Sequence, residues 1–147
     1  MVDMNVSLWP EIPINVVSPE VILKRQADLF NNASQRGMQC RVETKKITPQ
    51  SENDNSQVAH DLIIYSQVLK YSHVLLNAVH DWQSPYPVSV FSEHFPATVD
   101  FSPEAFAGRV YIAETEEDFF SALKQILQSK STLSVLNAIS ARINVQK

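Results

Sequence analysis

The sequence predicts an α+β protein: a two-layer sandwich in which an antiparallel sheet of four or five strands carries an N-terminal helix and two C-terminal helices on one face. Apolar residues recur at helical spacing over residues 19–36 and again after residue 115, while short apolar stretches separated by turns fill the middle of the chain. Consecutive strands with short connections normally pair antiparallel. The separated helices must then bury their apolar stripes on the sheet. The length of 147 residues suits a single globular domain over residues 1–147.

The N-terminal segment reads as an extended arm over residues 1–17, followed by a helix. Pro10 and Pro13 remove backbone donors and favour extended conformation. We expect Trp9 to dock this arm onto the body of the protein. Ser18 is a good N-cap and Pro19 suits the first helical position, so a helix is predicted over 19–36 and is expected to stop at Gly37.

A strand is predicted directly after this helix, because the apolar period changes to two. Met38, Cys40 and Val42 alternate with polar residues, which is typical of a half-buried strand. Cys40 lies on the apolar side and is interpreted as an inert core thiol. Residues 48–57 contain no apolar side chain and predict a solvated loop between two strands.

The stretch 58–82 favours two antiparallel strands with a turn near residues 70–72. A helix over 68–82 is the alternative, because apolar residues also recur there at helical spacing. Further short strands are predicted over 88–91 and 109–113, with a single helical turn near residues 102–104 between them.

Two helices complete the predicted chain. The first follows an N-cap at Thr115, with acidic residues in its first turn, and the second begins near Thr132. The predicted core joins these helices to the strands through Met38, Val42, Ile64, Leu76, Phe119, Leu123, Leu136 and Ile139.

Composition excludes several chemistries. Two glycines, far apart, cannot form a glycine-rich phosphate loop, and one cysteine allows neither an internal disulfide nor a multi-thiolate zinc site. A net charge of −4 with scattered cations disfavours nucleic-acid binding. No apolar run approaches the ~20 residues that span a bilayer, and no secretory signal is recognisable, so we expect a cytoplasmic protein without membrane contact.

The histidines do not predict a metal centre. His60-Asp61 and His80-Asp81 fall on expected strands, where adjacent residues face opposite ways, so we interpret them as polar residues near strand ends. His73 and His80 would also face opposite sides of a regular strand, unless a turn or bulge reorients them. The sequence predicts no catalytic constellation, no metal site and no cofactor.

The most suggestive surface is the predicted turn after the third strand, where aromatic and titratable residues gather. Tryptophan and tyrosine are enriched at binding hot spots. The leading hypothesis is a small non-catalytic interaction or accessory module that binds a protein partner or forms a homodimer. The alternative is a small-molecule-binding protein or hydrolase with a pocket near His80–Tyr86. Candidate binding residues are Trp9, His80, Asp81, Trp82, Tyr86 and His94.

Overall fold

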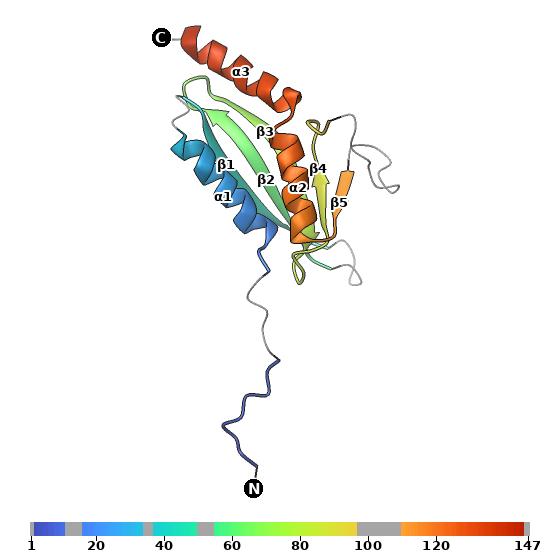
Figure 1. Cartoon of the computed structure of the whole chain (residues 1–147). Coiled ribbons are helices and arrows are strands. Elements are labelled where there is room, and N and C mark those ends of the chain that lie inside the picture. Colours follow the sequence, from blue (N-terminus) through green and yellow to red (C-terminus); the bar gives the residue numbers. More distant parts are fainter. Residues whose placement is uncertain (1, 11–15, 34–36, 50–54, 97–109, 146–147) are drawn as a thin grey trace.

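The computed structural model describes residues 2–10, 16–33, 37–49, 55–96 and 110–145. It confirms the α+β class: one antiparallel sheet has the strand order β1-β2-β3-β4-β5, so each strand pairs with its neighbours in sequence. In Figure 1, α1 and α2 lie against one face of the sheet, and α3 crosses the end at which β2 turns into β3. The elements are α1 (Pro19–Asn32), β1 (Gln39–Ile47), β2 (Gln57–Ser66), β3 (Tyr71–Asp81), β4 (Val88–Phe91), β5 (Val110–Ala113), α2 (Glu116–Leu127) and α3 (Lys130–Val145).

The ambiguous stretch forms two strands, so the helical alternative for 68–82 is wrong. β2 and β3 pair along their whole lengths. The turn lies earlier than predicted, at residues 67–70, where Lys70 has a φ of 51° and its N–H donates to the carbonyl of Gln67. The register shifts between Leu62 and Ile63, which inserts one extra residue into β3.

The core fills the space between the helices and one sheet face. Leu23, Leu62 and Phe119 are 1% exposed or less, and residues from α1, β1, β2, β3, β4, β5, α2 and α3 join the same cluster. Of the predicted core residues, Met38, Ile64, Leu76, Phe119, Leu123 and Ile139 are buried, as predicted. Val42 and Leu136 are partly buried against the cluster instead.

The first helix is shorter than predicted. It ends at Asn32, with Ala33 as its C-cap, before the predicted end at residue 36. Near this end, the Asn31 side chain donates to the carbonyl of Cys40 at 2.9 Å and accepts from the N–H of Cys40 at 2.8 Å. This pair of bonds fastens the last turn of the helix to β1. Gly37 has a φ of +75°, where L side chains are strained, and an added Cβ would lie 2.9 Å from Ile143 Cδ1.

The C-terminal helices begin close to where the sequence predicts. Thr115 caps α2 by accepting from the N–H of Asp118 at 3.1 Å. The interruption after Leu127 is short, and α3 starts at Lys130. The predicted helical turn near residues 102–104, the tip of the 48–57 loop and Arg109 lie outside the described residues. Among the helices that the structure describes, none is both long and apolar enough to traverse a bilayer.

Candidate interaction site

The predicted binding residues do not form one site. His80 is 9% exposed and bonds within the sheet, whereas Trp82 is 63% exposed and lies under the ammonium of Lys46, 5.3 Å from the ring centre. His94 is 4% exposed and contacts His73, at the other end of β3 from His80. The structure therefore separates residues that the sequence predicts to lie together near the turn after the third strand.

Tyr86 anchors the root of the N-terminal arm. Its hydroxyl donates to the carbonyl of Val17 at 2.7 Å, and the N–H of Val17 donates to Glu116 Oε2 at 3.3 Å. The ring packs edge-on against Phe119. Burial, together with the charge of Glu116, raises the pKa of Tyr86 to about 12. The arm thus leaves the body at a fixed position beside the start of α1.

A buried pair of histidines links β2 to β3. His60 Nε2 and His80 Nε2 lie 2.9 Å apart, and His60 is 1% exposed. His60 faces Ala78 and His80 faces Val58 in the register, so the two imidazoles are diagonal neighbours on the core side. The expectation that His60 lies near a strand end is wrong, because His60 sits in the middle of β2. Its position between Val58 and Leu62 on the apolar face is the sequence signal that marks it as buried.

The neighbours of this pair fix which nitrogen carries each hydrogen. His80 Nδ1 faces two carbonyl oxygens, of Asp81 at 2.8 Å and Ser84 at 3.2 Å, so it must carry a hydrogen. In the neutral pair, His80 Nε2 is then the acceptor and His60 Nε2–H the donor. The Thr44 hydroxyl completes the chain by donating to His60 Nδ1 over 2.8 Å.

A second histidine pair lies beside the end of β4. His73 Nε2 and His94 Nε2 are 2.8 Å apart, and His94 Nδ1 lies 2.6 Å from the hydroxyl of Ser131 at the start of α3. The extra residue in β3 places His73 opposite Ile64, on the same side of the sheet as His80. Sequence reasoning missed His73, because the bulge that turns it inward leaves no signal in the residue pattern.

Both pairs act as structural links. Burial first, and then the adjacent imidazole, lowers the pKa of His60 and of His94 below the usual value for histidine. In each pair one hydrogen lies between the two facing nitrogens, so one imidazole donates and the other accepts. Within the described part of the chain, no group of three or more His, Cys, Asp or Glu side chains could hold a metal ion.

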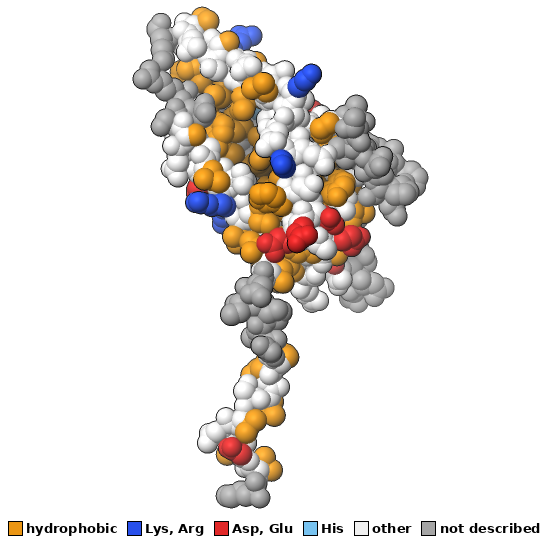
Figure 2. Space-filling view, viewed as in Figure 1, with side chains coloured by type: hydrophobic (Ala, Val, Ile, Leu, Met, Phe, Trp, Pro, Cys, Tyr) orange, Lys and Arg blue, Asp and Glu red, His pale blue; other side chains and the backbone are white. Residues whose placement is uncertain are grey.

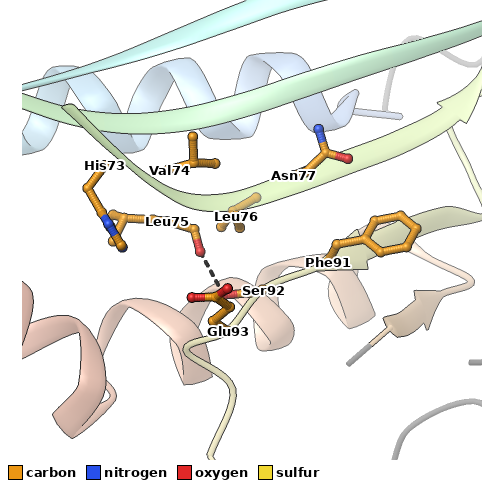
Figure 3. A pocket seen from close by; sticks show the side chains of 8 residues that line it. All are labelled: His73, Val74, Leu75, Leu76, Asn77, Phe91, Ser92 and Glu93. Atoms are coloured by element: carbon orange, nitrogen blue, oxygen red, sulfur yellow. Dashed lines mark hydrogen bonds between the residues drawn. The ribbon is translucent and has the colours of Figure 1, made fainter. Parts of the chain in front are cut away.

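A pocket opens where β4 stops pairing with β3. β4 pairs with Asn77–Val79, whereas no described strand pairs with β3 on that side between Tyr71 and Leu76. The cavity measures about 640 Å³ and is lined by Val74, Leu75, Leu76 and Phe91, with His73, Asn77, Ser92 and Glu93 also at its wall. Figure 3 shows these side chains on both sides of the β3 backbone, with the Ser92 hydroxyl donating to the Leu75 carbonyl at 2.6 Å.

The N-terminal arm projects away from the body, so the prediction that Trp9 docks it is wrong. Figure 1 shows residues 2–10 beyond the end of the sheet, and Figure 2 shows apolar side chains along the arm. The hydrogen bonds within it are local, from Asn5 N–H to Asp3 Oδ1 and from Trp9 N–H to Ser7 Oγ. Its large apolar side chains are 58–94% exposed: Val2, Met4, Val6, Leu8 and Trp9.

Comparison with known proteins finds no relative of this chain. No family model, curated protein or solved structure matches the chain. Function must therefore be argued from the geometry.

Two features of the described chain stand out: the exposed apolar side chains of the arm, and the β3 edge beside the apolar pocket, which no described strand pairs. The described cavities at β3 and β4, under α3, and between α1 and α2 do not include His80, Asp81, Trp82 or Tyr86 in their linings.

Proposed function

We propose that this protein is a small non-catalytic interaction module that self-associates through its N-terminal arm. The observation that carries the proposal is the exposure of Leu8 at 94%, Met4 at 90% and Trp9 at 83% on one short segment. Scattered apolar residues are ordinary on protein surfaces, but five exposed large apolar side chains gathered on residues 2–9 mark an interaction site.

The charge of the protein supports a protein partner over nucleic acid. The net charge is −4, and the cations of the described chain are dispersed, as at Lys24, Arg41 and Lys46. Phosphate binding needs clustered cations. The single cysteine, Cys40, is buried in the core, which is compatible with the cytoplasmic location that we propose.

A small-molecule-binding protein or hydrolase near His80–Tyr86 is less well supported. The ring nitrogens of His80 are engaged by His60 and by two carbonyls, and the Tyr86 hydroxyl by Val17. A general base must come within hydrogen-bond reach of the proton that it abstracts. In this arrangement both ring nitrogens of His80 face partners within the protein, and the Tyr86 hydroxyl donates its hydrogen to Val17.

Sedimentation velocity over a wide range of protein concentration tests the proposal. The unmodified chain is expected to shift from monomer to dimer, and Leu8→Ser with Trp9→Ser to stay monomeric. Leu133→Ser is the matched control, because Leu133 is also exposed, at 56%, but lies on α3. A chain that remains monomeric at every concentration, or that associates equally without the two arm side chains, would contradict the proposal.

A further inference from the structure

We infer that the N-terminal arm of one copy adds as a strand to the edge of β3 that no described strand pairs in a second copy, with its apolar side chains in the pocket beside β4. The inference rests on the proposed function and identifies the surface of the second copy that receives the arm. Strand addition is a common recognition mode, in which backbone hydrogen bonds supply affinity and pockets for alternate side chains supply specificity.

The direction of one β3 carbonyl shows where an added strand would pair. The Leu75 carbonyl faces away from β2, because it accepts from the Ser92 hydroxyl on the β4 side. This hydroxyl stands where the N–H of a neighbouring strand would donate. The unpaired stretch Tyr71–Leu76 spans roughly 20 Å at the rise of an antiparallel strand. Exposed edges of this kind are templates for pairing with another chain.

The arm has the pattern of a strand with one apolar face. Val2, Met4, Val6 and Leu8 occur at every second position, with Asp3, Asn5 and Ser7 between them. In an extended conformation the four apolar side chains would share one face. The pocket offers them Val74, which is 49% exposed, and Phe91, which is 40% exposed. Burying these groups together removes apolar surface from water on both sides.

Chain direction favours a second copy over the arm's own body. Val17 lies beside Tyr86, at the end of the sheet where β3 finishes, and Figure 1 shows the Tyr71 end of β3 at the opposite end. An arm folding back onto its own β3 would run parallel to it. Every strand pair in this sheet is antiparallel, and parallel pairing is slightly less stable per residue. An arm from another copy can enter in the antiparallel direction.

The stoichiometry follows from one arm and one β3 edge with its adjacent pocket per chain. Reciprocal exchange of arms closes a two-fold symmetric dimer, in which both edges are covered. One-way exchange would leave a free arm and a free edge at the ends of an open chain. We therefore expect dimers rather than larger assemblies.

Disulfide trapping between two different chains tests the inference. One chain carries Leu8→Cys, and the other carries either Val74→Cys or Phe91→Cys in the pocket. Native Cys40 is 6% exposed, so it stays out of the reaction, and the unmodified chain is the blank. We expect a disulfide-linked heterodimer from either mixture under mild oxidation. Leu29→Cys, 44% exposed on α1, is the matched acceptor control and is expected to give roughly tenfold less product.

Each result decides the inference. A cross-linked monomer from a single chain that carries both cysteines, with no heterodimer from the mixtures, would show that the arm binds its own β3 and would overturn it. Trapping at Leu29 instead of the pocket would also overturn it, by moving the acceptor to the helical face. If sedimentation shows a dimer while neither pocket cysteine is trapped, the acceptor is wrong and the proposed function stands. If no dimer forms, both fail.

Discussion

The pH dependence of stability should report the two buried histidine pairs. The pKa values of His60 and His94 are lowered in the folded protein, by burial first and by the facing imidazoles of His80 and His73 next. Glu20, Asp61 and Glu93 raise these pKa values and Lys24 lowers that of His60, without reversing either shift. At pH values between the pKa of each histidine in the folded protein and about 6.5, the unfolded chain therefore binds more protons than the folded protein does.

The sign and size of the effect follow from this difference. The free energy of unfolding should be level well above pH 6.5 and should decrease as the pH falls below it. Each histidine contributes at most about 1.4 kcal/mol per pH unit, so His60 and His94 together contribute at most about 2.8 kcal/mol per unit. Protonation of His60 also reverses its hydrogen bond with Thr44. His60 Nδ1–H then donates to the Thr44 hydroxyl oxygen, and the Thr44 hydroxyl can donate to Glu20 over 3.4 Å.

Urea unfolding in steps from pH 8.0 to 5.5 measures this slope. The range stays above the region where Glu20, whose pKa is lowered chiefly by its bond to Lys24, would lose its own contribution. His60→Gln is expected to weaken the dependence by about half, because one of the two shifted groups no longer titrates. His94→Gln is the matched variant. A free energy of unfolding that is flat or rises as the pH falls from 7 to 5.5 would refute the reasoning.

Three further outcomes follow from single contacts. Phe119→Ala should lower the free energy of unfolding by about 3–5 kcal/mol, measured by urea unfolding, because the ring is fully buried; a cost under 1 kcal/mol would mean that it is not. Burial raises the pKa of Cys40 to about 12, so a thiol reagent at pH 8 should label it only as fast as the protein unfolds, and rapid labelling of the folded protein would contradict this. Ser92→Ala frees the Leu75 carbonyl and should strengthen dimerisation in sedimentation experiments, whereas unchanged association would count against β3 as the acceptor.

The sequence predicts the elements well because each carries a local signal. The N-caps Ser18 and Thr115, the period-two stretch around Cys40 and the short strand at residues 88–91 all depend on neighbouring residues in the chain. The predicted end of α1 is wrong because a tertiary contact determines where the helix ends. Asn31 bonds to the backbone of Cys40 on β1, which a window of sequence cannot show.

The candidate site was harder to predict, because it depends on register and on missing partners. The pairing of His60 with His80 requires the turn at residues 67–70, and the inward direction of His73 requires the bulge opposite Leu62 and Ile63. The aromatic character of Trp9 and Tyr86 predicts binding residues, yet one is exposed on the arm and the other holds the arm's root. Composition identifies side chains that can form large apolar contacts, but not the surface that each of them contacts.

The emission spectrum of Trp9 against protein concentration tests the central claim most directly. The chain has two tryptophans, and Trp82→Phe leaves Trp9 as the single reporter. Trp9 is 83% exposed on the free arm, so its emission should shift to shorter wavelength as the concentration rises and the arm enters a second copy. The shift should follow the same concentration dependence as the dimer in sedimentation. Emission that stays typical of a solvated indole while the dimer forms would contradict the role of the arm.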